Sequence, residues 1–334
     1  MVRALRNLVG LAILAALLAA GWFVWFATHP ITPPSTPYQF VVRPGASVKA
    51  VSRQLGREGV FAEGESLWIL ARATGTTAIQ AGTYRIEPGN TPLELLDKLA
   101  RGDVVMTSVR FVEGTTLRQW LALLAADPEV RHTLAGKGEP EMRAIFGTAE
   151  PLEGWFFPDT YRFSPGATDV EILKRAHGAM MKRLNDAWAG RAPDLPLATP
   201  YEALILASIV EKETAVPAER PMVASVFVNR LKLGMRLQTD PTVIYGMGER
   251  YAGNIHKRDL TDDTPWNTYT RDGLPPTPIA MPGAEALRAA VHPADTGYLY
   301  FVAKGDGAHQ FSRTLDEHNR AVARYQLHAA VSGG

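Results

Sequence analysis

Residues 199–214 read TPYEALILASIVEKET, and they predict a helix around which the larger part of the chain is organised. The opening residues fit a capping box, with Thr199 as the N-cap, Pro200 at the first helical position and Glu202 reaching back. The eight residues that follow are apolar except for Ser208. Because a helix that is apolar on all sides is normally a buried one, we expect this helix to lie in the core of a domain.

The C-terminal end of the predicted helix contains Glu211, Lys212 and Glu213. Glu211 comes three residues after Ser208 and shares its face, whereas Glu213 points elsewhere. Burial and the negative pole of the helix should both raise the pKa of Glu211, toward the range in which a glutamate can donate a proton. The residues alone leave a second interpretation open, in which Glu211 forms a salt bridge with Lys212.

The N-terminus predicts a membrane anchor. Arg3 and Arg6 are followed by no charged residue from 7 to 28, and the run 8–27 is long enough to cross a hydrocarbon layer of roughly 30 Å. A cleaved signal peptide is the alternative, because 19–21 (AAG) resembles a cleavage site. The apolar run continues beyond that site through aromatic residues typical of a membrane interface, which favours an uncleaved anchor.

The distribution of basic residues sets the expected orientation. Arg3 and Arg6 precede the apolar run, and the next basic residue outside it, leaving histidine aside, is Arg43. The positive-inside rule then predicts a single-pass protein of the cytoplasmic (inner) membrane, with its N-terminus in the cytoplasm. The bulk of the chain would lie in the periplasm or another extracytoplasmic space.

Composition excludes several classes of function. Thirty-five basic residues against 34 acidic ones give a net charge of +1, so the basic excess of a nucleic-acid-binding protein is missing. The chain has no cysteine, which excludes disulfides and thiolate chemistry. The histidines from residue 256 to residue 318 lack the short spacing of a metal site; they are His256, His292, His309 and His318. We therefore expect no metal and no cofactor, and place His309 and His318 in the core or in turns.

A local pattern recurs three times after the anchor: a strand-like run, a glycine, a hydroxyl residue and a helix-like segment. The glycine suits the turn, and the Ser or Thr caps the following helix. The strand-like runs are 40–43, 84–87 and 109–112, and the caps are Ser47, Thr91 and Thr116. The first part of this region resembles LysM-like domains, small modules that bind glycans containing N-acetylglucosamine. A spacer without a ligand is the other interpretation.

We predict an α+β fold in which the membrane helix is followed by a LysM-like α/β module and a larger mixed catalytic domain. Helices are expected at 169–189, 200–214, 219–233 and 313–328, a strand at 298–304, and loops at 127–150 and 189–200. The predicted divisions are 1–29 (cytoplasmic tip and anchor), 30–37 (proline-rich linker), 38–108 (LysM-like), 109–328 (catalytic) and 329–334 (tail).

Five long runs, in order, resemble the MltG (YceG-like) family of endolytic murein transglycosylases. They are LEGWFFPDTYRF (152–163), LILASIVEKET (204–214), ERPMVASVFVNRLKLGMRLQTDPTVIYGMG (219–248), WNTYTRDGLPPTPIA (266–280) and YLYFVAKGDGAHQFSRTLDEHNRAV (298–322). The resemblance covers about residues 40–325. Trp266 departs from the tyrosine expected before Asn-Thr-Tyr, a change from one aromatic residue to another.

The resemblance implies a role for particular residues. The catalytic glutamate of the family corresponds to Glu211, the first glutamate of A-S-I-V-E-K-E-T. The motifs that would line the glycan cleft, together with the serine on the Glu211 face, give the predicted substrate-binding residues Ser208, Asn229, Gln238, Thr239, Asp240, Tyr245, Asn267 and Tyr269.

The resemblance also implies a reaction. Glu211 would protonate the oxygen between N-acetylmuramic acid and N-acetylglucosamine, and would then take a proton from the C6 hydroxyl of the same sugar as it attacks C1. The product is a 1,6-anhydro end. The resemblance implies that the enzyme ends the growth of glycan strands, and that its partners are peptidoglycan strands and cell-wall synthases or elongation proteins. A hydrolase that uses Asp159, Asp240 or Glu213 as its second carboxylate, and a glycan-binding scaffold without activity, remain alternatives.

Overall fold

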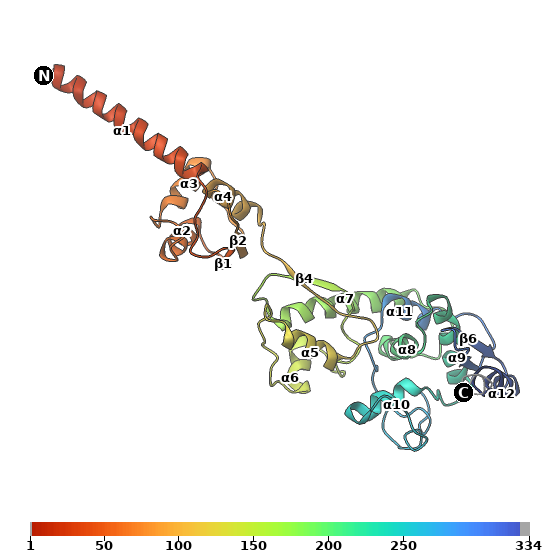
Figure 1. Cartoon of the computed structure of the whole chain (residues 1–334). Coiled ribbons are helices and arrows are strands. Elements are labelled where there is room, and N and C mark those ends of the chain that lie inside the picture. Colours follow the sequence, from red (N-terminus) through yellow and green to blue (C-terminus); the bar gives the residue numbers. More distant parts are fainter. Residues whose placement is uncertain (1, 328–334) are drawn as a thin grey trace. The chain divides into compact units, whose positions relative to one another are not determined.

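The structure is a computed structural model that describes residues 2–327. It confirms the predicted mixture of helices and strands, and the chain divides into two compact units (Figure 1). Unit 1 is the chain up to Thr107 together with Arg162–Gly166, and unit 2 is Ser108–Tyr161 together with the chain from Ala167 on. The segment 162–166 thus groups with unit 1, although the sequence places it in the second domain. The predicted tail 329–334, and residue 328, lie outside the described residues.

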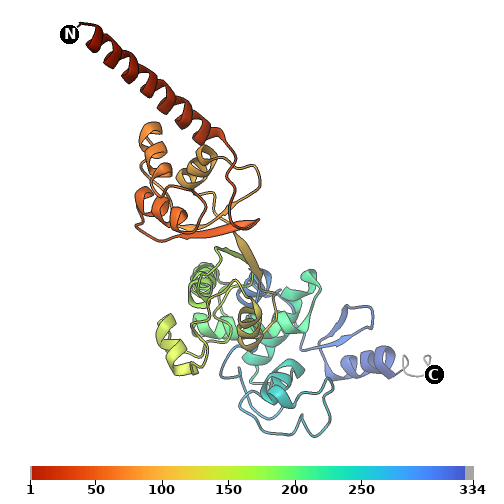
Figure 2. The ribbon, with the colours of Figure 1, turned by 60° about the vertical axis from the view of Figure 1, so that its left-hand side comes forward.

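Unit 1 consists of a long N-terminal helix followed by a small module of strands and helices (Figure 2). The strands β1 and β2 pair antiparallel, with Tyr38 opposite Ile86. The elements are α1 (Val2–Thr28), β1 (Tyr38–Val42), α2 (Val48–Arg57), α3 (Ser66–Thr74), β2 (Gly82–Ile86) and α4 (Pro92–Arg101).

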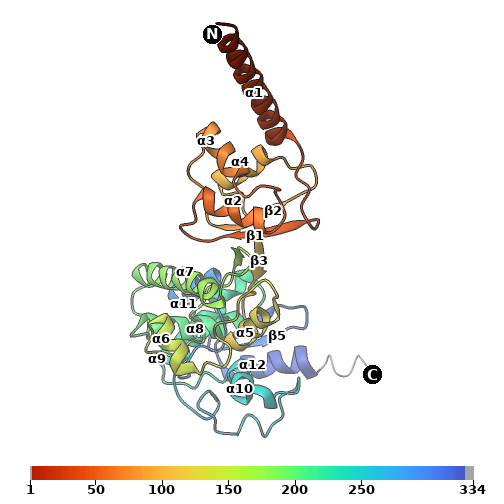
Figure 3. The same cartoon turned by 90° about the vertical axis from the view of Figure 1, so that its left-hand side faces the viewer.

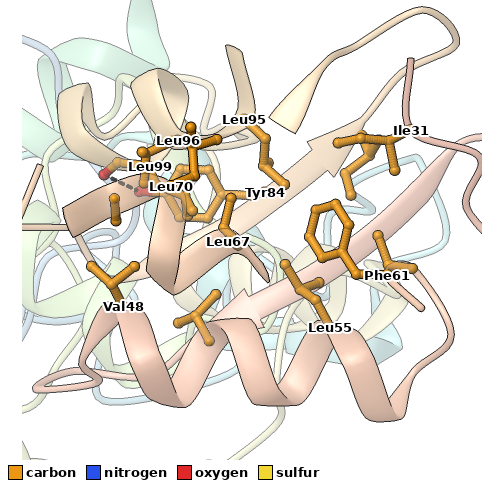
Figure 4. Packing of buried hydrophobic residues seen from close by; sticks show 14 of the residues in the cluster. Ile31, Val48, Leu55, Phe61, Leu67, Leu70, Tyr84, Leu95, Leu96 and Leu99 are labelled. Carbon is orange, nitrogen blue, oxygen red and sulfur yellow. Dashed lines mark hydrogen bonds between the residues drawn. The ribbon is translucent and has the colours of Figure 1, made fainter. Parts of the chain in front are cut away.

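The core of unit 1 is formed by apolar side chains (Figure 4). They come from both strands, from the three helices of the module and from the segment after α1. Tyr84 lies at its centre with none of its surface exposed, and its hydroxyl donates to the carbonyl of Gln80 at 2.8 Å. The C-terminal end of α1 takes part, because Ala27 is buried and the Phe26 ring lies 5.7 Å from that of Phe61. The last turns of α1 are therefore part of the packing of unit 1.

From Leu8 to Gly21, α1 is exposed and apolar. Leu5–Thr28 has a mean hydropathy of 2.3, and among the described residues it is the one helix long and apolar enough to cross a membrane. Length and composition support a single-pass anchor, and a signal sequence would meet the same criteria.

Unit 2 is mostly helical and contains a strand hairpin, β5–β6, near its C-terminal end. The strands β3 (Thr107–Arg110) and β4 (Thr160–Phe163) also pair, and both contain a point at which the chain crosses between the units. The remaining elements are α5 (Leu117–Ala126), α6 (Glu139–Phe146), α7 (Asp169–Ala189), α8 (Pro200–Glu213), η1 (Pro217–Glu219), α9 (Arg220–Lys232), α10 (Asp240–Met247), η2 (Gly248–Arg250), α11 (Ala284–Val291), β5 (Tyr300–Ala303), β6 (His309–Ser312), α12 (Leu315–Val322) and the π-helical turn Ala323–Leu327.

Helix α8 lies at the centre of unit 2, as its apolar sequence predicts. It packs against α7, α9, α10 and α11, and Figure 3 shows it below α7 and α11. The stretch Ala203–Val210 is entirely buried. Thr199 caps the helix by accepting from the amide of Glu202 at 3.2 Å. The second half of the predicted capping box is wrong, because Glu202 accepts from the amide of Ala198, one residue earlier, at 2.6 Å.

The predicted caps of the repeated strand–helix pattern are confirmed. Ser47 accepts from the amide of Ala50, while Thr91 and Thr116 form complete capping boxes. The predicted loop at 127–150 is wrong in part, because it contains α6. This helix has its own local signals: Glu141 accepts from the amide of Gly138 at its start, and a left-handed Gly147 ends it.

Candidate functional site

The carboxylate of Glu211 is held at the end of α8 by two donors. The guanidinium of Arg220 donates to Oε1 at 3.2 Å, and the amide of Gly283 donates to Oε2 at 2.9 Å. The side chains of Glu211 and Arg220 are only 6% and 11% exposed. A nearly buried carboxylate therefore has one charged and one neutral hydrogen-bond partner.

Local structure explains why both donors are present. The short turn η1 follows α8 and leads directly into α9, so Arg220 at the start of α9 returns to the end of α8. Gly283 is the N-cap of α11, where amide groups point outward and favour a negative charge. The predicted alternative, a salt bridge between Glu211 and Lys212, is wrong: Lys212 donates instead to the carbonyl of Gly114 at 3.1 Å.

A second carboxyl group, Glu113, lies at the same glycine. A Cβ atom added to Gly283 would be 2.0 Å from Oε1 of Glu113, so this carboxyl group occupies the space that a side chain would need. Glu113 is exposed at the surface. Burial of its carboxyl end and the charge of Glu211 both raise its pKa above the ordinary value, against the opposing charge of Arg220.

Glu213 has a different environment from Glu211. It lines a pocket of about 450 Å³, and it accepts a short hydrogen bond from the hydroxyl of Thr239. Burial raises the pKa of Glu213 to about 7, which the Thr239 bond only partly opposes. Glu213 is therefore able to keep a proton near neutral pH, without an ion pair of its own.

Three of the predicted substrate-binding residues, Gln238, Asp240 and Tyr269, line the same pocket. The Tyr269 hydroxyl donates to Oδ1 of Asp240 at 2.6 Å, and burial raises the pKa of this tyrosine. Gln238 has a φ of +49°, a left-handed conformation that is uncommon for a residue with a side chain. Arg230 supports this loop by donating to the carbonyl of Leu237 at 2.8 Å.

The other predicted substrate-binding residues hold backbone in place. Ser208 and Asn267 are completely buried; the hydroxyl of Ser208 accepts from the amide of Ile279 at 3.0 Å, and the amide group of Asn267 donates to the carbonyl of Asp262 at 2.8 Å. Thr239 is 2% exposed. All three side chains are thus covered by protein.

Asn229 and Tyr245 are half-buried and have protein partners too. The Asn229 side chain donates to the carbonyls of Thr296 and Tyr298, at 2.8 and 3.0 Å. The Tyr245 hydroxyl donates to Glu153 at 3.2 Å, and burial raises the pKa of Glu153 to about 7. These contacts fix loops around α8.

The predicted core or turn histidine His309 forms a pair with Glu219. Its amide and its ring Nδ1 both lie within hydrogen-bond distance of the Glu219 carboxylate, at 2.9 and 2.7 Å. Although burial acts in the other direction, these contacts hold the pKa of Glu219 below its ordinary value. Among residues 2–327, no group of three or more histidine or acidic side chains is arranged to hold a metal ion.

Three residues near the Glu211 carboxylate are not among the site residues predicted from the sequence: Arg220 and Gly283, which donate to it, and Glu113, which lies against Gly283. Arg220 lies within one of the quoted family runs, and Glu113 directly precedes the glycine of the third strand–helix pattern. That pattern predicts the turn at Gly114 and the start of α5, but no local signal connects Glu113 with α8.

Comparisons with known proteins agree with this architecture. A protein of Bacillus subtilis (strain 168) named endolytic murein transglycosylase is 33% identical to this chain. The alignment covers 84% of this chain and 82% of that protein. A protein of the same name from Streptococcus pneumoniae (strain D39) is 27% identical over 94% of this chain. The chain spans 64% of that streptococcal relative.

A solved structure supports the same relationship. The crystal structure of a YceG-like protein from Listeria monocytogenes, at 2.6 Å, matches with a TM-score of 0.55 and 29% identity, and the match covers 85% of this chain and 99% of that one. A sequence model of the YceG-like family matches residues 40–324, and with this match the chain belongs to the YceG-like family.

Proposed function

We propose that this chain is an endolytic peptidoglycan lytic transglycosylase, a lyase, with Glu211 as its acid–base catalyst. The observation that carries the proposal is a nearly buried carboxylate at the end of a core helix, held by Arg220 and the amide of Gly283, within a chain of this family. The relatives named endolytic murein transglycosylase supply the substrate class.

In the first step, Glu211 donates a proton to the oxygen between N-acetylmuramic acid and N-acetylglucosamine. The C1–O bond breaks, and the N-acetyl group of the sugar helps to stabilise the positive charge that develops at C1. The guanidinium of Arg220 and the amide of Gly283 then stabilise the carboxylate that remains.

In the second step, the Glu211 carboxylate takes the proton of the C6 hydroxyl as that oxygen attacks C1. The new bond closes a 1,6-anhydro ring, Glu211 is protonated again, and no water is consumed. Attack from within the same sugar has a large proximity advantage over attack by a separate molecule.

The pocket beside Glu213 supports recognition of sugars. Gln238 and Asp240 are exposed, and Tyr269 offers an aromatic face and a hydroxyl. Amide, carboxylate and hydroxyl groups suit hydrogen bonds to sugar hydroxyls, and the ring suits stacking. We assign direct contacts to these three residues, and assign loop positioning to Ser208, Asn229, Thr239, Tyr245 and Asn267.

One observation favours a second candidate, a glycoside hydrolase. A hydrolase uses two carboxyl groups on either side of the scissile bond, and Glu113 supplies a second one near Glu211. Its product would carry an ordinary reducing end rather than a 1,6-anhydro end.

Product analysis tests the proposal. Purified glycan strands are digested with the wild-type chain and with Glu211→Gln, and the fragments are identified by mass spectrometry. We expect 1,6-anhydro ends from the wild type and almost no fragments from the variant. Reducing ends alone would favour the hydrolase, and full activity of Glu211→Gln would remove Glu211 from the mechanism.

We further propose that α1 stays attached as a single-pass anchor in the cytoplasmic membrane, with the N-terminus in the cytoplasm. Arg3 and Arg6 precede the apolar run, and the packing of Phe26 and Ala27 onto unit 1 gives the end of α1 a structural role. N-terminal sequencing of protein from membranes tests this: a sequence that begins after residues 19–21 would identify a cleaved signal peptide instead.

The region 38–108 is proposed as a LysM-like glycan-binding module, between the linker 30–37 and a catalytic domain at 109–328. A groove of about 400 Å³ in this region has polar side chains at its edge, among them Arg43, Gln54 and Arg57. Replacing these residues in the full chain should weaken co-sedimentation with peptidoglycan. Unchanged co-sedimentation would favour a simple spacer.

Cell-wall synthases or elongation proteins are proposed as partners, because a tethered enzyme that ends growing strands would act beside them. Crosslinking in membranes tests this: recovery of a synthase crosslinked to the wild-type chain would support the proposal, and crosslinks to unrelated membrane proteins only would contradict it.

A further inference from the structure

Unit 2 contains a second cavity, which has no part in the proposed reaction. It has a volume of about 480 Å³ and lies between β6 and α12, two elements that pack against each other near the C-terminal end of the unit (Figure 1). Three arginines line it, and we call it the arginine cavity: Arg313, Arg320 and Arg324. A cavity of this size, with several cationic side chains at its wall, is large enough for a polar ligand.

The sequence of α12 brings the charged side chains of the arginine cavity together. Glu317, Arg320 and Arg324 are three and four residues apart, so they follow one stripe along α12 and the π-helical turn after it. Arg313 directly precedes Thr314, the N-cap of the helix. The basic groups of the cavity therefore come from both ends of α12.

The positive charge of the arginine cavity is not compensated. Among residues 2–327, no carboxylate forms a salt bridge with Arg313, Arg320 or Arg324, and their side chains have no hydrogen-bond partner. Glu317 also lines the cavity, but its carboxylate caps α12 by accepting from the amides of Arg313 at 2.8 Å and Thr314 at 3.2 Å. Three positive charges and one negative charge leave +2 among the described lining residues, in a chain whose total is +1.

Two of the arginines are supported by aromatic rings of the cavity. The guanidinium of Arg313 lies 5.7 Å from the centre of the Tyr298 ring, and that of Arg324 lies 5.2 Å from the centre of the Tyr325 ring. A guanidinium over a ring loses little of its hydrogen-bonding capacity, because its N–H groups point outward in the plane of the group. Such a fork matches the two oxygens of a carboxylate, so the expected ligand is an anion of this type.

The arginine cavity and the pocket that contains Glu213 are formed by the same elements. His309 and His318 line the Glu213 pocket, whereas the adjacent residues Gln310 and Glu317 line the arginine cavity. Adjacent residues on a strand or a helix point in different directions, so the two cavities open on different sides of β6 and α12. A helix is about 10–12 Å wide, and an extended peptide of about four residues spans roughly 13 Å. A peptide attached to a sugar in the Glu213 pocket is therefore long enough to reach the arginines.

We propose that the arginine cavity binds a carboxylate of the short peptide that peptidoglycan carries on N-acetylmuramic acid. The inference rests on the proposed function, which supplies the substrate and places its sugars in the Glu213 pocket. The guanidiniums of Arg313, Arg320 and Arg324 donate to the carboxylate oxygens. The chain then prefers glycan strands that still carry their peptides over bare strands.

Binding of two disaccharides tests the proposal without turnover. In both, N-acetylglucosamine precedes a terminal N-acetylmuramic acid, so the bond that is cut in the proposed reaction is missing. One carries its peptide with free carboxylates, and in the other these carboxylates are converted to amides. Calorimetry on the full chain in detergent micelles gives both Kd values.

The wild-type chain should bind the disaccharide with free carboxylates about tenfold more tightly than the amidated one. The double variant Arg320→Gln, Arg324→Gln should bind the two equally. Both arginines are exposed, so their replacement leaves the core of unit 2 intact. Equal binding by the wild type, or a preference that the double variant retains, would overturn the proposal.

The matched control is the double variant Arg131→Gln, Arg191→Gln. Both are exposed arginines of unit 2 that lie outside the arginine cavity and form no salt bridge with a described residue. The control loses the same two charges, and it should keep the tenfold preference. An equal loss of preference in the control would show an effect of net charge alone and would contradict the proposal.

Inorganic phosphate is the probe for a general anion site. A cavity that selects the peptide by its carboxylate and by its attachment to the sugar should keep the disaccharide when phosphate is present at the same concentration. Displacement of the disaccharide by phosphate under these conditions would overturn the proposal.

Kinetics supply the functional readout. In Arg320→Gln, Arg324→Gln the KM for peptide-bearing strands should rise about tenfold, toward the KM for strands from which the peptides have been removed, while kcat changes little. The two failures can be told apart because the disaccharides are not cut. An arginine-dependent preference without 1,6-anhydro products would contradict only the proposed function, whereas 1,6-anhydro products without that preference would contradict only the peptide site.

Discussion

Glu211 and Glu213 are two residues apart on α8, yet they lie in opposite electrostatic environments. Glu211 is bound by a guanidinium and by an amide at a helix N-terminus. Glu213 is bound by the hydroxyl of Thr239, and burial raises its pKa to about 7. One carboxyl group is therefore compensated as an anion, and the other is stabilised as a neutral acid.

The difference shows that burial by itself does not identify a catalytic glutamate. Both groups are largely covered, but only Glu211 has donors that can stabilise the charge produced when it gives up a proton. Glu213 is suited to donate a hydrogen bond into the pocket it shares with Gln238 and Tyr269.

The largest expected effect is on activity. Glu211→Gln should lower kcat about 10³-fold because it removes the group that gives and takes the proton. Glu213→Gln keeps a neutral hydrogen-bonding side chain, so its kcat should fall by no more than about fivefold. Fragment release from glycan strands gives both rates. Equal losses in the two variants would contradict the assignment.

Next in size is the effect of the ion pair on stability. Arg220→Ala leaves Glu211 nearly buried without its cation, so the free energy of unfolding of unit 2 should fall by about 4 kcal/mol. Arg236→Ala, which breaks an exposed pair with Asp272, is the control and should cost less than about 1 kcal/mol. Urea denaturation followed by tryptophan fluorescence measures both. A similar small loss in both variants would show that Arg220 does not stabilise the fold.

The pH dependence of stability tests Glu213. Its pKa is about 7 in the fold against 4.5 when exposed to water, so the fold favours the neutral form. This stabilisation is complete below pH 4.5 and is lost as the pH rises through about 7, on the order of 3 kcal/mol in all. Glu213→Gln should remove that part of the decline. Parallel stability curves for wild type and variant between pH 4.5 and 7 would contradict it.

The smallest expected effect concerns the pocket. Tyr269→Phe removes the hydroxyl bonded to Asp240 but keeps the ring, so KM should rise by about fivefold while kcat changes little. Kinetics on strands of defined length measure the split. Tyr251→Phe is the control, because its hydroxyl bonds only a nearby carbonyl in an exposed loop. A fall in kcat as large as that of Glu211→Gln would instead show that Tyr269 takes part in the catalytic step.

The sequence predicts the features that depend on neighbouring residues. The N-cap of α8, its buried length and the caps of the strand–helix pattern all follow from spacing and turn chemistry. It also separates Glu211 from Glu213, because two residues along a helix point to different sides. The bounds of α7 and α8 are within one residue of the prediction.

The surroundings of Glu211 depend on contacts that no local pattern reveals. Gly283 is 72 residues from Glu211, and Gly114 is 98 residues from Lys212. Glu113 lies against Gly283, and nothing in its local sequence connects it with α8. Polar loop residues raise a similar problem, because Asn267 and Gln238 look alike in sequence, although the first is fully buried and the second exposed.

The central claim is that Glu211 directs cleavage without water, and the most direct measurement is digestion in water enriched in the heavy oxygen isotope. Mass spectrometry of the new ends should find 1,6-anhydro ends with no heavy oxygen from the wild type, and neither kind of new end from Glu211→Gln. New reducing ends that carry the heavy isotope would contradict the account, because water would then have attacked C1.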